Sequence, residues 1–102
     1  MIVNNGRDTV TMESVTIDSL NLKTVNLIKI DAEGFENEVF IGAKGTISQF
    51  RPKLIIESHT RKNKEFLLNE LTKLGYKVRH ESAITHSEEP GFDDVQVLFL
   101  SV

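Results

Sequence analysis

The stretch L-I-K-I-D-A-E-G-F-E, residues 27–36, contains a complete transition from a strand to a helix. Residues 25–30 read V-N-L-I-K-I, a short and nearly continuous apolar run that is typical of a strand buried on both faces of a parallel sheet. The tight loop Asp31-Ala32-Glu33-Gly34 follows this strand. Apolar residues then recur every three or four positions over residues 36–49, which predicts a helix, and its two glycines weaken that helix enough to allow a break.

The same alternation continues on both sides of this stretch. A helix is predicted over residues 63–74, with Gly75 as its C-terminal stop. Asp18 is expected to cap a short helical turn near the N-terminus. Further strands are predicted over residues 10–17, 53–57, 76–80 and 95–100, and turn signals occur at Asn4-Asn5-Gly6 and Pro90-Gly91.

This order of elements predicts an α/β fold built on a mixed sheet. Strands that alternate with helices form a parallel sheet with right-handed crossovers. The last two strands have no helix between them, so they are expected to pair antiparallel as a hairpin at the edge of the sheet. The polar segment 81–94 would then be the hairpin connection.

Composition excludes several classes of protein. The 102 residues make one domain at most. The net charge of −3 argues against a binder of nucleic acid or anionic membranes, because both need a basic surface. The absence of cysteine excludes disulfides and thiolate chemistry. No apolar run approaches the roughly 20 residues of a membrane span, and the N-terminus has no signal-peptide pattern, so a cytoplasmic location is expected.

Four polar residues are candidates for a functional site. Asp31 and Glu33 follow the first buried strand, whereas Glu57 and His59 lie at the end of the second. Ligands of open α/β sheets bind beyond the carboxyl ends of the strands, so the four side chains would converge if the two strands are neighbours. Such a group suits a divalent metal through oxygen ligands, or a general base supplied by His59 or by a carboxylate.

Structural explanations for the same residues remain open. Asp31 fits a helix cap, and Gly34 fits a residue that merely relieves a tight turn. Glu57 and His59 also fit polar positions where the chain reaches the surface. The acids Glu88, Glu89, Asp93 and Asp94 are interpreted as a solvated part of the hairpin connection.

Residues 15–58 resemble the FkbM-type methyltransferases. The resemblance rests on four pieces: V-T-I-D-S-L at 15–20, L-I-K-I-D-A-E-G-F-E at 27–36, V-F-I-G-A at 39–43 and R-P-K-L-I-I-E at 51–57. The most specific part is I-K-I-D-A-E-G-F-E followed by G-A, with its spacing kept across two strands and a helix.

The resemblance implies a Rossmann-like class I methyltransferase fold, with seven strands of which the last is antiparallel. The strands of this chain would be the fourth to the seventh, in the spatial order 4-5-7-6. The family uses S-adenosylmethionine, typically to methylate a hydroxyl oxygen of a small molecule or sugar. Asp31, supported by Glu33, would contact the acceptor or the cofactor's amino group, and Glu57 or His59 would complete the acceptor site.

The family's glycine-rich cofactor loop has no counterpart in this sequence, which contains no G-x-G-x-x-G. Residues 1–102 are therefore expected to be the C-terminal part of a methyltransferase domain that is inactive alone. It would pair with a cofactor-binding half or form a homodimer through its uncovered strand edge. A non-catalytic α/β subunit or dimerisation module is the alternative.

Overall fold

The computed structural model describes residues 2–4, 9–11, 15–84 and 95–102 of the chain. The predicted turns at Asn4-Asn5-Gly6 and Pro90-Gly91, and the acids between residues 88 and 94, fall at least partly outside the described residues. The elements, in chain order, are β1 (Ile2–Asn4), β2 (Thr9–Thr11), the 3-10 helix η1 (Asp18–Leu20), β3 (Leu27–Ile30), α1 (Glu36–Ile41), α2 (Lys44–Phe50), β4 (Lys53–Ser58), α3 (Arg61–Lys73), β5 (Lys77–Ile84) and β6 (Val95–Ser101).

The main sheet has four strands in the order β3-β4-β6-β5, and β1 pairs with β2 in a separate antiparallel ladder. Strands β3 and β4 are parallel, whereas β6 runs antiparallel to both of its neighbours. The prediction of an α/β fold with a mixed sheet and an antiparallel C-terminal pair of strands is therefore confirmed. The last strand lies inside the sheet, between β4 and β5.

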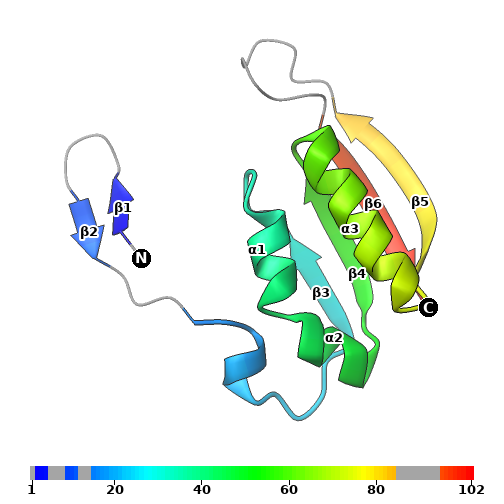
Figure 1. Ribbon diagram of the computed structural model, residues 1–102, viewed down its shortest axis with the longest axis horizontal. Coiled ribbons are helices and arrows are strands. Elements are labelled where there is room, and N and C mark those ends of the chain that lie inside the picture. The colour runs from blue at the N-terminus through cyan, green and yellow to red at the C-terminus, as the bar shows by residue number, and fades with distance from the viewer. Residues whose placement is uncertain (1, 5–8, 12–14, 85–94) are drawn as a thin grey trace.

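The three α-helices lie together on one side of this sheet (Figure 1). The prediction that residues 25–30 are buried on both faces is therefore wrong: Ile28 and Ile30 are buried, but Leu27 is 56% exposed. Right-handed crossovers that advance in the same direction along a sheet place their helices on the same face. Both the connection from β3 to β4 and the one from β4 to β5 advance in that direction.

The hydrophobic core fills the space between the helices and the covered face of the sheet. Leu67 and Leu71 of α3 are completely buried there, as the predicted apolar face of that helix requires. The other members of the buried cluster are Ile28, Ile30, Phe40, Ala43, Ile47, Leu54, Ile56, Tyr76, Leu98 and Leu100.

Several predicted boundaries shift. The helix over residues 36–49 breaks at its first glycine, as its composition allowed, into α1 and α2. The prediction of a strand over residues 10–17 is wrong in its second half, because Val15 and Thr16 are not in a strand. Residues 12–14 lie outside the described part of the chain. The prediction that residues 81–94 form the hairpin connection is partly wrong too, because β5 extends to Ile84 through its ladder with β6.

Asp18 caps a helix that is distant in the sequence, so the predicted local cap is wrong. Its side chain makes no cap hydrogen bond within η1. Instead, Oδ2 accepts from the backbone N–H of Gly45 at 3.0 Å, and Oδ1 accepts from the N–H and the hydroxyl of Thr46, both at 2.7 Å. A Cβ atom at Gly45 would lie 3.0 Å from Oδ2, so this approach favours glycine. The carboxylate thereby binds the first turn of α2, which lacks a cap of its own.

Among the described residues, no helix is both long and apolar enough to cross a membrane.

We expect Asp18→Ala to lower the free energy of unfolding by about 1 kcal/mol at pH 7, as the loss of a helix cap does. The hydroxyl of Thr46 lowers the pKa of Asp18 from its ordinary value of 3.8, although burial opposes the change. The stabilisation is then complete above pH 3.8 and is lost as the pH falls through the lowered pKa of the folded state. Urea unfolding of both proteins at pH 7 and at several values below pH 4 measures this. A difference that stays constant throughout the acid range would contradict the ionised cap.

Candidate functional site

The parallel register of β3 and β4 places two acids together at the carboxyl ends of these strands. Ile30 pairs with Ile56, and each is followed directly by an acid, Asp31 in one strand and Glu57 in the other. His59 lies two residues beyond Glu57, just after the end of β4. The strands run side by side with their ends together, so residues 26 positions apart in the sequence meet at the same edge.

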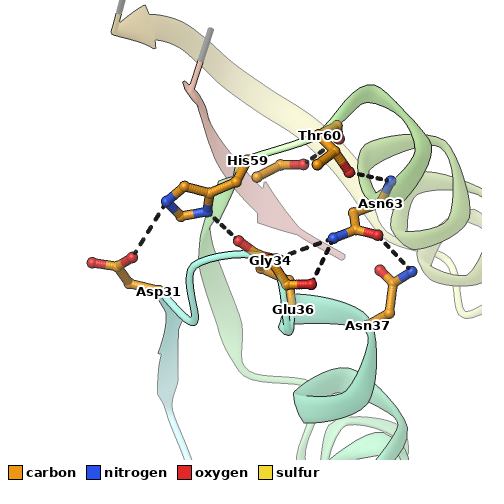
Figure 2. Close-up of polar contacts among 8 residues, drawn as sticks. Asp31, Gly34, Glu36, Asn37, His59, Thr60 and Asn63 are labelled. Carbon is orange, nitrogen blue, oxygen red and sulfur yellow. Dashed lines mark hydrogen bonds and ion pairs between the residues drawn. The ribbon is translucent and has the colours of Figure 1, made fainter. Parts of the chain in front are cut away.

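Three of the four candidate residues converge there. One ligand atom from each of Asp31, Glu57 and His59 lies within 4.8 Å of the other two. The Nε2 atom of His59 is 3.9 Å from Oδ1 of Asp31 (Figure 2). The side chain of His59 is 14% exposed and that of Asp31 is 45% exposed, so the group is open to a ligand on the aspartate side.

Glu33 is not part of this group, so the predicted convergence is wrong for this residue. It has a positive φ of 45° and is exposed, and Gly34 follows with a φ of 99°. The N–H of Phe35 donates to the carbonyl of Ala32 at 3.0 Å, which closes the turn between β3 and α1. The backbone turns sharply at Glu33 and Gly34, and the side chain of Glu33 is left at the tip of the loop.

Glu36 belongs to the site, although it was not among the candidate residues predicted from the sequence. It is fully buried, with no exposed surface. Its Oε1 contacts Nδ1 of His59, and Oε2 accepts from Nδ2 of Asn63 at 3.3 Å. Its place in the helix was the missed signal. Glu36, Phe40, Ala43 and Ile47 follow one another at spacings of four, three and four, so the glutamate lies on the apolar face.

Asn63, in the first turn of α3, ties this arrangement together. Its Nδ2 also donates to the carbonyl of Gly34 at 3.0 Å, and its backbone N–H donates to Oγ1 of Thr60 at 3.1 Å. Thr60 is the N-cap of α3, so the cap holds Asn63 in place. Asn37 of α1 donates from Nδ2 to Oδ1 of Asn63 at 3.2 Å (Figure 2). The loop, α1 and α3 are thus joined directly behind His59.

The buried carboxylate determines how His59 is presented. When the carboxylate of Glu36 is ionised it only accepts hydrogen bonds, and the hydrogen of this contact then lies on Nδ1 of His59. In the neutral imidazole the lone pair then lies on Nε2, the atom that faces Asp31. This arrangement can accept a proton at Nε2 or donate the lone pair to a metal ion. The sequence suggested His59 as a general base without showing the orientation of its ring.

Comparison with known proteins gives one family. The model of the Methyltransferase FkbM domain matches residues 3–78, a range that includes all the residues of the site. No curated protein matches the chain. No solved structure matches it either.

We expect Glu36→Ala to lower the free energy of unfolding by about 1–3 kcal/mol, because Nδ1 of His59 loses its partner inside the protein. Glu38→Ala is the matched control: Glu38 lies on the same helix but is exposed, so its loss should cost less than about 0.5 kcal/mol. Chemical denaturation of the two variants and the parent provides the comparison. Equal losses for the two variants would show that the buried carboxylate does not brace the site.

Proposed function

Because this chain belongs to the FkbM methyltransferase family, we propose that it takes part in S-adenosylmethionine-dependent methyl transfer to a hydroxyl oxygen of a small molecule or sugar. The observation that carries the proposal is the grouping of Asp31, Glu57 and His59 at the carboxyl ends of two parallel strands. Ligands of open α/β sheets bind at such an edge. Two carboxylates and an imidazole are also groups that can orient a hydroxyl and withdraw its proton.

The residues present suit one end of the cofactor. Asp31 offers a half-exposed carboxylate directly after a strand, a good partner for the positively charged amino group of S-adenosylmethionine. When bound, this cofactor supplies an electrophilic methyl group. We propose that Asp31 contacts either that amino group or the acceptor.

Glu57 and His59 complete the acceptor side in this proposal. An acceptor hydroxyl becomes a strong nucleophile only when its proton is drawn away. Nε2 of His59 is presented toward Asp31 by the contact between Nδ1 and Glu36, so an oxygen held between these side chains would meet a proton acceptor. The rigid support from α1 and α3 favours a constant geometry, which is the protein's main contribution to a transfer of this kind.

We further propose that β3, β4, β6 and β5 correspond to the fourth, fifth, seventh and sixth strands of the class I methyltransferase sheet. The order and directions of the described strands support this assignment. The chain would then supply the C-terminal part of the domain. The remaining half would pair with the edge of β3, which has only β4 as a neighbour among the described strands. A second copy of the chain is the other partner that would fit this edge.

The chain by itself should bind S-adenosylmethionine weakly, with a dissociation constant well above the micromolar range. The reason is that the sequence contains no glycine-rich loop whose backbone could approach the cofactor closely. Calorimetric titration of the purified chain tests this expectation. Micromolar affinity in a monomeric sample would show that these residues hold the whole cofactor site.

In a methyltransferase assembly that contains this chain, Asp31→Asn should lower turnover by about 100-fold or more, as the loss of a group that acts on the reacting atoms does. Stability should change by less than about 0.5 kcal/mol, because the side chain is half-exposed. Glu38→Gln, an exposed change on α1 away from the edge, should retain activity. Transfer of a labelled methyl group and thermal unfolding measure the two effects. Unchanged turnover together with a large loss of stability would make Asp31 a structural residue.

A further inference from the structure

We propose that Asp31, Glu57 and His59 bind a divalent transition-metal ion of the Mn²⁺ or Zn²⁺ type at the end of β3 and β4. The inference rests on the proposed function, since it names the ion that the same site would use to hold the acceptor oxygen. Three observations support it: the spacing of the donor atoms, the support behind His59, and the chemistry of the donor set.

The spacing suits a shared ion better than direct contact. The 3.9 Å between Nε2 of His59 and Oδ1 of Asp31 is too long for a hydrogen bond, which needs about 3.2 Å or less. Two ligands that each lie about 2.0–2.2 Å from one ion are separated by about 3–4.4 Å, depending on the angle between them. The three donor atoms lie within 4.8 Å of one another. Small side-chain movements would therefore bring all three to bonding distance.

Glu36 provides the support that metal-binding histidines usually have. A histidine that binds a metal through one nitrogen commonly donates the hydrogen of its other nitrogen to a carboxylate, which fixes the tautomer and the orientation of the ring. Here that carboxylate is fully buried and contacts Nδ1. It is held in turn by Asn63 at the start of α3. With the hydrogen on Nδ1, the nitrogen that faces Asp31 would carry the lone pair.

The donor set indicates the class of ion. Two carboxylates and one imidazole suit Mn²⁺ or Zn²⁺, whereas Ca²⁺ prefers a shell made only of oxygens. Asp31 and Glu57 also place two negative charges close together, and a divalent cation would offset their repulsion. Three protein ligands leave further coordination positions open. An acceptor hydroxyl bound at one of them would lose its proton more easily than in water. That proton would go to solvent, because Nε2 of His59 would bind the ion and would not act as the base.

Titration of the purified chain with Mn²⁺, followed by the electron paramagnetic resonance signal of the free ion, tests the site. We expect one Mn²⁺ per chain, and at least about tenfold weaker binding after Glu57→Gln. Glu33→Gln is the matched control, because it removes the same charge from the neighbouring loop without removing a ligand. It should weaken binding by less than about threefold, the effect of a more distant exposed charge. Circular dichroism establishes that both variants retain the fold.

A second measurement needs no variant. Bound Mn²⁺ broadens the nuclear magnetic resonance signals of nearby protons most strongly, so the ring signals of His59 should disappear at a lower occupancy than those of His80, which lies two strands from β4 on β5. Either of two results would overturn the proposal: no binding at millimolar Mn²⁺, or equal weakening by Glu57→Gln and Glu33→Gln. Methyl transfer that continues in the presence of a chelator would reject the metal while leaving the proposed function intact.

Discussion

The parallel pairing of β3 with β4 is the constraint on which the rest of this structure depends. It aligns Ile30 with Ile56, so that both strands present their buried residues to the same layer of helices. The same register brings Asp31 and Glu57 to one edge, because each follows directly after a paired isoleucine. A shift of one residue in this pairing would turn the apolar side chains of one strand away from the core and separate the two acids. The stability of the sheet and the assembly of the site therefore depend on one register.

The fully buried carboxylate of Glu36 in the layer of helices has partners for both of its oxygens. Glu36 lies on the apolar face of α1, where an unpaired carboxylate would be costly, and its two oxygens reach His59 and Asn63. Asp18 serves a comparable purpose at the other end of the layer, where its carboxylate binds the first turn of α2. Each acid joins segments that are more than 20 residues apart in the sequence. Both contacts are long-range alternatives to local capping.

In this arrangement, one side of His59 is held in place by buried groups and the other side is accessible to a ligand. The Nδ1 side of His59 faces buried, hydrogen-bonded groups, whereas the Nε2 side faces the half-exposed Asp31. A ligand at the edge of the sheet would therefore meet side chains whose positions are already determined by the packing of α1 and α3. Membership of the FkbM methyltransferase family gives this site a chemical context, since methyl transfer requires an oriented acceptor more than it requires covalent help from the protein.

The sequence by itself determined the alternation of strands and helices and the antiparallel final pair, and it allowed a break in the helix near its two glycines, because periodicity, glycine and chain connectivity act locally. It also showed that Asp31, Glu57 and His59 follow two buried strands, and the family resemblance came from a stretch that includes Asp31 and Glu57. Tertiary packing alone decided which face of the sheet is covered, where the carboxylate of Asp18 binds, that Glu33 is not part of the group, and that Glu36 is buried against His59. Those outcomes depend on contacts between segments distant in the sequence, and no local pattern specifies the partner of a polar side chain until the chain has folded.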